Sequence, residues 1–166
     1  MSKKVLIVMG SDSDLPLMEA CMARLDAFEI AWEAVICSAH RSPERAADLA
    51  TYAAERGFGV IIAAAGLAAH LPGVLAAYTT LPVIGVPLAA GSLQGVDALL
   101  AEVQMPTGIP VATVAINGAD NAAILSAQIL ALSDADLQQK LVAFKIELSE
   151  GVYAKNQRLQ EKLNNR

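Results

Sequence analysis

Two kinds of segment alternate along the chain. Five short runs are almost wholly apolar, which is typical of strands buried on both faces of a parallel sheet. Between these runs apolar residues recur at helical spacing, as Leu15, Met18, Met22 and Leu25 do. The expected strands are Val5–Met9, Ile30–Ile36, Val60–Ala64, Pro82–Val86 and Val111–Ile116.

Turn and capping residues indicate where the helices begin. Asp14 is expected to cap the first helix, with Pro16 in its first turn, and Ser42-Pro43 is expected to open the second. Ser133 is expected to cap the last helix. Strands that alternate with helices predict an α/β fold, a three-layer doubly wound parallel sheet with right-handed crossovers. In such folds ligands bind beyond the carboxyl ends of the strands.

The length and the net charge of the chain limit the number of domains and the kinds of binding partner that we expect. A chain of 166 residues suits one well-filled core, and the net charge of −5 argues against a nucleic-acid partner, which requires a basic face. We expect a catalytic domain over residues 1–132 and a C-terminal helix over 133–166. That helix has an apolar stripe (Leu137, Leu141, Phe144, Leu148) and is expected to pack on a neighbouring subunit.

The cysteines and the apolar stretches predict the compartment. Cys21 and Cys37 lie far apart among apolar residues, which indicates reduced buried thiols rather than a disulfide or metal framework. No signal peptide is expected before the first strand, and the longest apolar stretch, Val60–Ala69, is too short to cross a bilayer. We therefore expect a soluble cytoplasmic protein with no membrane contact and no metal.

The loop after the first strand is the first candidate for ligand binding. Gly10 allows close backbone approach, and the hydroxyls of Ser11 and Ser13 beside a helix start suit a phosphate. Asp12 and Asp14 would repel a phosphate, but they accept hydrogen bonds from ribose hydroxyls or turn amides. A capped turn with no ligand explains this loop equally well.

The loop after the second strand adds a cation and a titratable group. Arg41 offers the bidentate anion partner that the first loop lacks, and Ser38 and Ala39 precede it. His40 is one of two histidines, and an imidazole suits proton transfer near neutral pH. The alternative is a histidine in a turn with no functional role, although the position of His40 at a strand end beside an arginine favours a functional one.

The loop after the third strand, Gly66–Gly73, is apolar except for His70. A lone histidine in such a loop is more often structural than catalytic. Other sites on this fold do not match the chain. A receiver domain needs an aspartate at the end of the third strand, where Ala63-Ala64-Ala65 stands, and a flavodoxin needs aromatic residues to stack the flavin, yet aromatic residues are only 4%.

Taken in order, five motifs resemble one known family over most of the chain. They are Met9-Gly10-Ser11-Asp12-Ser13-Asp14, Ser38-Ala39-His40-Arg41, Ala68-Ala69-His70-Leu71-Pro72-Gly73, Gly85-Val86-Pro87 and Val103-Gln104-Met105-Pro106. This set is similar to that of the bacterial N5-carboxyaminoimidazole ribonucleotide mutases, the class I form of the purine-pathway carboxylase subunit. The resemblance runs from Val5 to about Leu132.

The resemblance implies a flavodoxin-like fold and an isomerase of purine (IMP) biosynthesis. The implied reaction moves a carboxyl group from the exocyclic amine of the imidazole ribonucleotide to the adjacent ring carbon, with no metal or cofactor. It implies His40 as the acid/base residue and a homo-octameric assembly. The substrate-binding residues it implies are Gly10, Ser11, Asp12, Ser13, Asp14, Ser38, Ala39, Arg41, Gly66, Leu67, His70 and Leu71.

Departures from the family pattern leave alternatives. Ala64 and Leu67 replace two glycines of the family's loop, and Leu67 needs a backbone conformation and a space that glycine supplies freely. Leu67 is therefore expected to narrow the carboxylate pocket or to shift the loop. A direct carboxylase that uses free carbon dioxide is the nearest alternative, although the chain keeps Ala69–Pro72. A non-catalytic nucleotide-binding module is the second, and it would not need His40.

Overall fold

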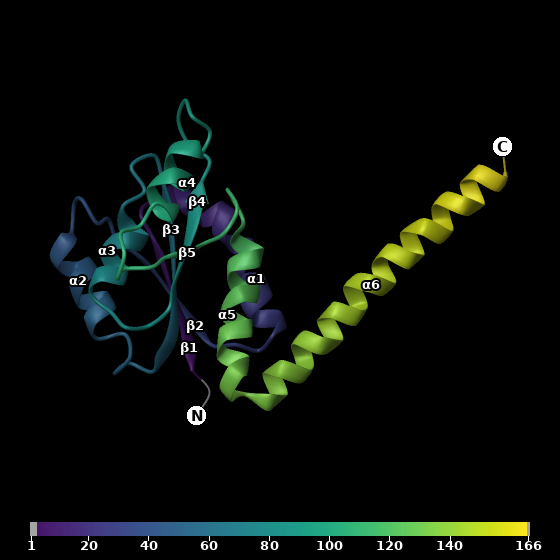
Figure 1. Ribbon diagram of the computed structural model, residues 1–166, viewed down its shortest axis with the longest axis horizontal. Coiled ribbons are helices and arrows are strands. Elements are labelled where there is room, and N and C mark those ends of the chain that lie inside the picture. Colours follow the sequence, from purple (N-terminus) through teal and green to yellow (C-terminus); the bar gives the residue numbers. More distant parts are fainter. Residues whose placement is uncertain (1–2, 166) are drawn as a thin grey trace.

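A parallel sheet flanked by helices forms the body of the protein, as the computed structural model of residues 3–165 shows (Figure 1). The strand order is β2-β1-β3-β4-β5, and every neighbouring pair is parallel. This is the order of flavodoxin-like folds. The strands are β1 (Lys4–Met9), β2 (Trp32–Ile36), β3 (Phe58–Gly66), β4 (Val83–Leu88) and β5 (Ala112–Thr113). The predicted fold class is confirmed.

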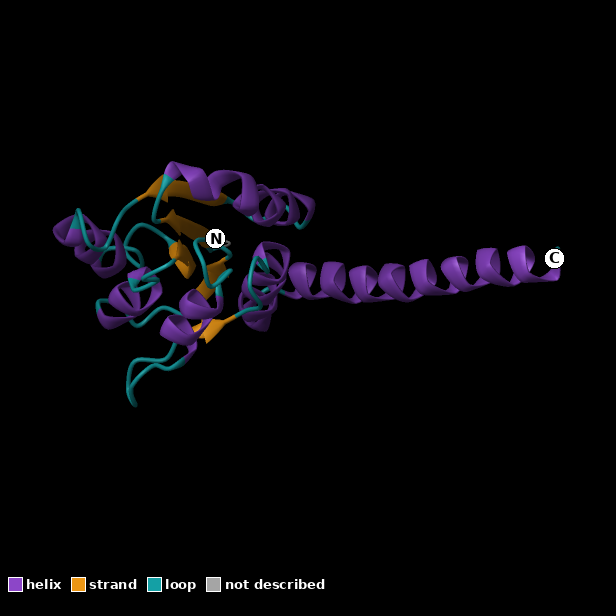
Figure 2. Ribbon diagram, turned by 90° about the horizontal axis from the view of Figure 1, so that it is seen from above, coloured by secondary structure: helices purple, strands orange, loops and turns teal. Residues whose placement is uncertain are grey.

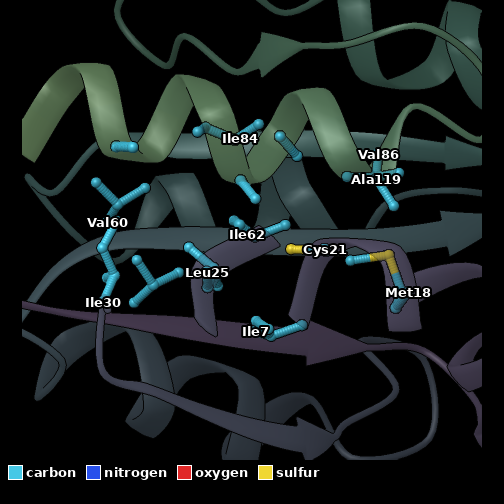
Figure 3. Packing of buried hydrophobic residues seen from close by; sticks show 14 of the residues in the cluster. Ile7, Met18, Cys21, Leu25, Ile30, Val60, Ile62, Ile84, Val86 and Ala119 are labelled. Atoms are coloured by element: carbon cyan, nitrogen blue, oxygen red, sulfur yellow. The ribbon is translucent and has the colours of Figure 1, made fainter. Parts of the chain in front are cut away.

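Helices cover both faces of this sheet (Figure 2). On one face α1 (Leu15–Ala27) and α5 (Ala119–Leu130) pack over alternate strand residues such as Ile7, Ile62 and Ile84 (Figure 3). On the other face α2 (Pro43–Thr51), α3 (Leu71–Ala77) and α4 (Val96–Val103) pack over the remaining positions, such as Leu6 and Ile61. Because both faces are covered, the strands are apolar throughout, as their continuous pattern predicted.

The register brings the carboxyl ends of the central strands to one edge. Met9 of β1 pairs with Ile36 of β2 and with Ala64 of β3, and Gly66 of β3 pairs with Leu88 of β4. The loops that follow these strands therefore leave the sheet side by side. The three loops singled out in the sequence are among them.

The fifth strand is shorter than the predicted Val111–Ile116. Only Ala112 and Thr113 form a regular ladder with β4, and pairing then continues irregularly through the Val114 amide to Gly85 and the Asn117 amide to Pro87. Pro87 accepts that bond but has no amide to return one, which interrupts the ladder beside this edge strand.

One of the predicted helix caps is wrong. The last helix, α6 (Ala135–Asn164), is capped by Asp134, whose carboxylate accepts from the Leu137 amide at 3.0 Å, and not by Ser133. Asp14 occupies the N-cap position of α1, as predicted, but its side chain makes no cap bond there; a short 3₁₀ turn over Asp12–Asp14, capped by Ser11, precedes that helix. Serine and aspartate cap almost equally well, so the choice between neighbours depends on the path of the backbone.

The helix α6 leaves the body of the protein and extends away from it (Figure 1). Leu137 is buried, and Leu141 and Phe144 pack against the core beneath α1 and α5. Beyond them large apolar side chains are exposed, among them Leu148, Val152 and Leu159. No helix within residues 3–165 is both long and apolar enough to cross a bilayer.

Candidate active site

A cavity of about 550 Å³ lies at the carboxyl edge of the sheet, where the loops after β1, β2, β3 and β4 meet. Its lining includes eleven of the thirteen residues predicted for the site: Gly10, Ser11, Ser13, Asp14, Ser38, Ala39, His40, Arg41, Gly66, Leu67 and Leu71. Asp12 lines an adjoining cavity of about 440 Å³, which shares Gly10, Ser11, Ser38 and Arg41 with the first. His70 reaches the site through His40, as described below.

The loop after β1 folds on itself through its own side chains. Asp14 Oδ2 accepts from the Ser11 amide at 2.9 Å, and Ser11 Oγ accepts from the Ser13 amide at 3.3 Å. Ser13 Oγ donates to Ser11 Oγ at 2.9 Å. Burial raises the pKa of Asp14, while the Ser11 amide and the Ser13 hydroxyl act in the opposite direction. Asp14 thus shapes the turn, and the two serine hydroxyls face the cavity from a fixed backbone.

The loop after β2 presents Arg41, the only arginine or lysine among the residues that line the cavity. Ser38 Oγ accepts from the Arg41 amide at 3.3 Å and from Arg41 Nε at 3.4 Å. Ser42 is the N-cap residue of α2 and Pro43 its first residue, as predicted, and the Ser42 hydroxyl donates to the Ser38 carbonyl at 2.9 Å. Among the ion pairs found within residues 3–165 none involves Arg41. Its guanidinium is therefore available to an anionic ligand.

The two histidines of the chain contact one another directly. His40 Nε2 lies 2.8 Å from His70 Nδ1, and the rings are edge to face with centroids 5.0 Å apart. One of these two nitrogens carries the shared proton, since a hydrogen bond requires one donor. His40 comes from the loop after β2 and His70 from the residue just before α3, so their contact is formed only by the folded sheet.

The polar and the apolar lining residues of the cavity come from different loops. The loops after β1 and β2 supply the polar side of the lining, with Ser11, Ser13, Asp14, Ser38 and Arg41. The end of β3 and the segments after β3 and β4 supply the apolar side, with Ala65, Gly66, Leu67, Ala68, Leu71 and Ala90. Ala65, Ala68 and Ala90 were not among the predicted site residues. Ala90 belongs to the loop after β4. An alanine has no functional group that would mark it as a site residue in a sequence. Only the fact that β3 and β4 are neighbours in the sheet would have indicated that this loop reaches the site.

The loop after β3 adopts tight turns. The Ala69 amide donates to the Leu67 carbonyl, and the His70 amide donates to the Ala68 carbonyl, both at 2.8 Å. Leu67 has φ +54°, in the left-handed region that disfavours residues with a β-carbon. The expectation that Leu67 needs a glycine-like conformation is confirmed. Within residues 3–165 no cluster of three or more His, Cys, Asp and Glu side chains could hold a metal ion.

Comparison with known proteins agrees with this geometry. The AIR carboxylase family matches residues 4–151. An N5-carboxyaminoimidazole ribonucleotide mutase of Pyrococcus horikoshii is 52% identical over 155 residues, which are 93% of this chain and 88% of the relative. A phosphoribosylaminoimidazole carboxylase of Saccharomyces cerevisiae is 51% identical over 154 residues, which are 93% of this chain and 27% of the yeast protein.

A solved structure extends the comparison to the fold. The crystal structure of Treponema denticola PurE is similar with a TM-score of 0.86 and 27% identity, over 95% of this chain and 98% of that one. Together with the sequence matches, it confirms the resemblance inferred from the ordered motifs. The chain belongs to the AIR carboxylase family.

Proposed function

We propose that this protein is an N5-carboxyaminoimidazole ribonucleotide mutase, an isomerase of purine biosynthesis. It converts N5-carboxyaminoimidazole ribonucleotide into 4-carboxy-5-aminoimidazole ribonucleotide. The observation that carries the proposal is the position of His40, which lines the same cavity as Arg41 and the small residues of the loop after β3 and contacts His70. The family's relative in Pyrococcus horikoshii bears the mutase name.

The polar side suits the ribose phosphate of such a substrate. Ser11 and Ser13 supply hydroxyls, and Arg41 supplies a guanidinium, which a phosphate engages through two parallel hydrogen bonds. Asp14 is turned toward its own loop amides, so its charge is partly compensated before a phosphate arrives. Asp12 lies in the adjoining cavity and is assigned to the ribose end of the ligand.

The chemistry needs one group that gives a proton and takes one back. The imidazolium of His40 protonates the exocyclic nitrogen, the nitrogen–carbon bond breaks with its electrons staying on nitrogen, and carbon dioxide is released. The electron-rich ring carbon then attacks carbon dioxide and forms the new carbon–carbon bond. Neutral His40 removes the proton from that ring carbon, which restores aromaticity and regenerates the imidazolium. The reaction is balanced without a metal or cofactor.

His70 is assigned to the orientation of the His40 ring. The Nδ1 atom of His70 lies within hydrogen-bond distance of His40 Nε2, and His70 is the N-cap residue of the short helix α3. A fixed ring is required because the same imidazole must reach first the nitrogen and then the adjacent carbon. The apolar side, built from Ala65, Gly66, Leu67 and Leu71, surrounds the released carbon dioxide with small groups that exclude water.

Two alternatives make different predictions. A direct carboxylase would take carbon dioxide from solution, and the yeast relative bears a carboxylase name, although this chain matches only 27% of that protein. A non-catalytic nucleotide-binding module would need Ser11, Ser13 and Arg41 but not the His40–His70 contact. The fate of the transferred carbon distinguishes all three.

The test follows a carbon-13 label in the carboxyl group of N5-carboxyaminoimidazole ribonucleotide by NMR, in the presence of unlabelled bicarbonate. The mutase moves the label to the ring carbon undiluted, and His40→Asn abolishes the transfer. Arg41→Ala raises KM, whereas Arg45→Ala, an exposed arginine on α2 outside the cavity, is the matched control. Product carrying mainly unlabelled carbon supports the direct carboxylase, and binding without product formation supports the binding module.

We further propose a homo-octamer in which α6 packs on a neighbouring subunit. A groove of about 640 Å³ between the end of α5 and α6 is lined by Leu132, Val142 and Ile146, all of them exposed. Light scattering on the intact chain tests this proposal, with Val142→Asp expected to reduce the assembled mass. An unchanged mass after that substitution would contradict a role for this face.

The proposed setting is the cytoplasm, with an ATP-dependent carboxyaminoimidazole synthetase as the enzyme that supplies the labile carbamate. Two free, buried thiols, Cys21 and Cys37, are compatible with a reducing compartment. Adding the synthetase to the NMR assay tests the link, because direct supply would keep the label undiluted even when substrate is generated slowly.

A further inference from the structure

Leu67 contacts the neighbouring loop at Gly91, a position where the absence of a side chain makes room for it. A β-carbon placed on Gly91 would lie 2.5 Å from Leu67 Cδ2, a distance that real side chains do not tolerate. Gly91 itself has φ +61°, and Leu67 has φ +54°. The loop after β3 and the loop after β4 therefore meet through one leucine side chain seated on one glycine.

The seat of Leu67 is held in place by several independent contacts. Next to it, Gly66 approaches Ala90 so closely that a β-carbon on Gly66 would lie 3.1 Å from Ala90 Cβ. The Ala89 amide donates to Asn117 Oδ1 at 2.9 Å, and Gln94 Nε2 donates to the Gly91 carbonyl at 2.9 Å. Hydrogen bonds thus hold the segment from Ala89 to Gly91 at both of its ends, and they restrict the movement of the loop that Leu67 contacts.

This contact lies on the apolar side of the cavity. Leu67, Ala68 and Ala90 all line the space that His40 also lines. Leu67 is nevertheless 54% exposed, so its side chain stands between the cavity and the solvent rather than in the core. Left-handed backbone conformations at residues other than glycine cluster at functional sites, so this conformation, together with an exposed apolar side chain at the cavity, points to a role in the site.

We infer that Leu67, seated on Gly91, is the specificity-determining residue that closes the carbon-dioxide end of the site and decides whether the freed carbon is captured or lost. The inference rests on the proposed mutase function. Carbon dioxide that leaves the cavity is hydrated to bicarbonate, and carbon dioxide from solution then replaces it on the ring carbon. Because Gly91 has no side chain, the leucine side chain fills the space beside it in this chain and thereby reduces the exchange.

The experiment measures the unlabelled fraction of product at early times, with labelled substrate, excess unlabelled bicarbonate and a blank without enzyme. In the wild type this fraction is expected to stay close to the unlabelled fraction of the substrate itself in the blank, where no product forms. In Leu67→Ala and Leu67→Gly it is expected to rise several-fold, because the opening is no longer filled. Leu67→Gly also removes the left-handed strain, so this variant is expected to fold.

Two further variants test whether the contact, and not the loop in general, is responsible. Gly91→Ala displaces Leu67 and is expected to increase exchange in the wild type, but to add little in the Leu67→Ala background, since the two changes act on one contact. Leu93→Ala is the matched control. Leu93 lies in the loop after β4, as Gly91 does, but it is 60% exposed and is not among the residues that line the cavity.

The outcomes separate this inference from the proposed function. Label retention in Leu67→Ala and Leu67→Gly equal to that of the wild type would overturn the role of Leu67 while leaving the mutase intact. Equal loss of label in Leu93→Ala would overturn it too, as would a wild type that already exchanges freely. A wild type that forms no product would contradict the mutase function, and the inference with it.

Discussion

Gly85 and Glu102 occupy complementary volumes in the core beneath α4. A β-carbon on Gly85 would lie 2.5 Å from Glu102 Oε2, so the missing side chain of the strand residue makes room for the carboxyl of the helix residue. Glu102 is fully buried, and neither of its carboxyl oxygens has a hydrogen-bond partner among the described residues. Such a group is stable in the core only when it is protonated.

The first prediction concerns stability against pH. Burial raises the pKa of Glu102 to about 9, from 4.5 for an ordinary glutamate. Between these values the folded state holds a proton that the unfolded chain has released, so the free energy of unfolding falls as the pH rises. We expect a loss on the order of a few kcal/mol from pH 5 to pH 9.

Thermal unfolding across that range checks this prediction with Glu102→Gln, whose amide does not titrate. The slope of Tm against pH should become markedly flatter in this variant. Glu55→Gln, which changes an exposed glutamate, is the control and should leave the slope unchanged. A wild-type slope that survives in Glu102→Gln would show that other groups cause it.

The second prediction concerns the fit between these residues. Gly85→Ala should destabilise the protein by about 1–3 kcal/mol, because the new methyl group overlaps the Glu102 carboxyl in a packed core. In a Glu102→Ala background the same substitution should cost much less, since the opposing group is gone. Denaturant unfolding of the four proteins in this cycle measures the coupling. Additive costs would mean that the two residues do not share space.

The third prediction concerns Asn117, which tertiary contacts place behind the site. Its side-chain oxygen accepts from the Ala89 amide at 2.9 Å, and its φ is +57°, which glycine also adopts readily. Asn117→Gly therefore removes the hydrogen bond from the Ala89 amide without adding backbone strain. It should lower kcat/KM several-fold, because the loop that contributes Ala90 to the cavity lining becomes more mobile.

Steady-state kinetics checks the Asn117 prediction, and unfolding of the same variant provides the control for stability. Asn117→Asp keeps an acceptor at the same position and should restore most of the lost activity. A loss of activity in Asn117→Asp equal to that in Asn117→Gly would argue against the hydrogen bond as the cause.

The fourth prediction concerns the attachment of α6. Arg24 on α1 forms a two-point ion pair with Asp120 on α5, at 2.7 and 3.2 Å, and its guanidinium lies 4.6 Å from the ring of Phe144 on α6. Phe144 also packs edge to face on Phe28. Phe144→Ala should destabilise the protein by about 1–3 kcal/mol, since the ring is only partly buried.

Hydrogen exchange locates that effect. Protection should fall in the first turns of α6 and at the ends of α1 and α5, but not in β3. Val152→Ala, which truncates an exposed residue farther along the same helix, is the control. Uniform loss of protection across the sheet would mean that Phe144 supports the whole core rather than this attachment.

Much of the site could be predicted because its polar side chains come from short sequence motifs that occur in a fixed order along the chain. Ser11, Ser13, Ser38, His40 and Arg41 stand out as polar residues directly after apolar runs, and parallel strands end at one edge. The alanines at positions 65, 68 and 90 could not be found in this way, because they contribute shape and not functional groups.

The sequence by itself determined the order of elements, the α/β class and the loops that carry the chemistry, because local periodicity, turn residues and motif spacing are properties of neighbouring residues. Only the tertiary structure decided that His40 meets His70, that Leu67 rests on Gly91 and that Gly85 accommodates Glu102. Each of these pairs joins different loops or elements, and their distances depend on sheet register and helix packing, which no local pattern encodes.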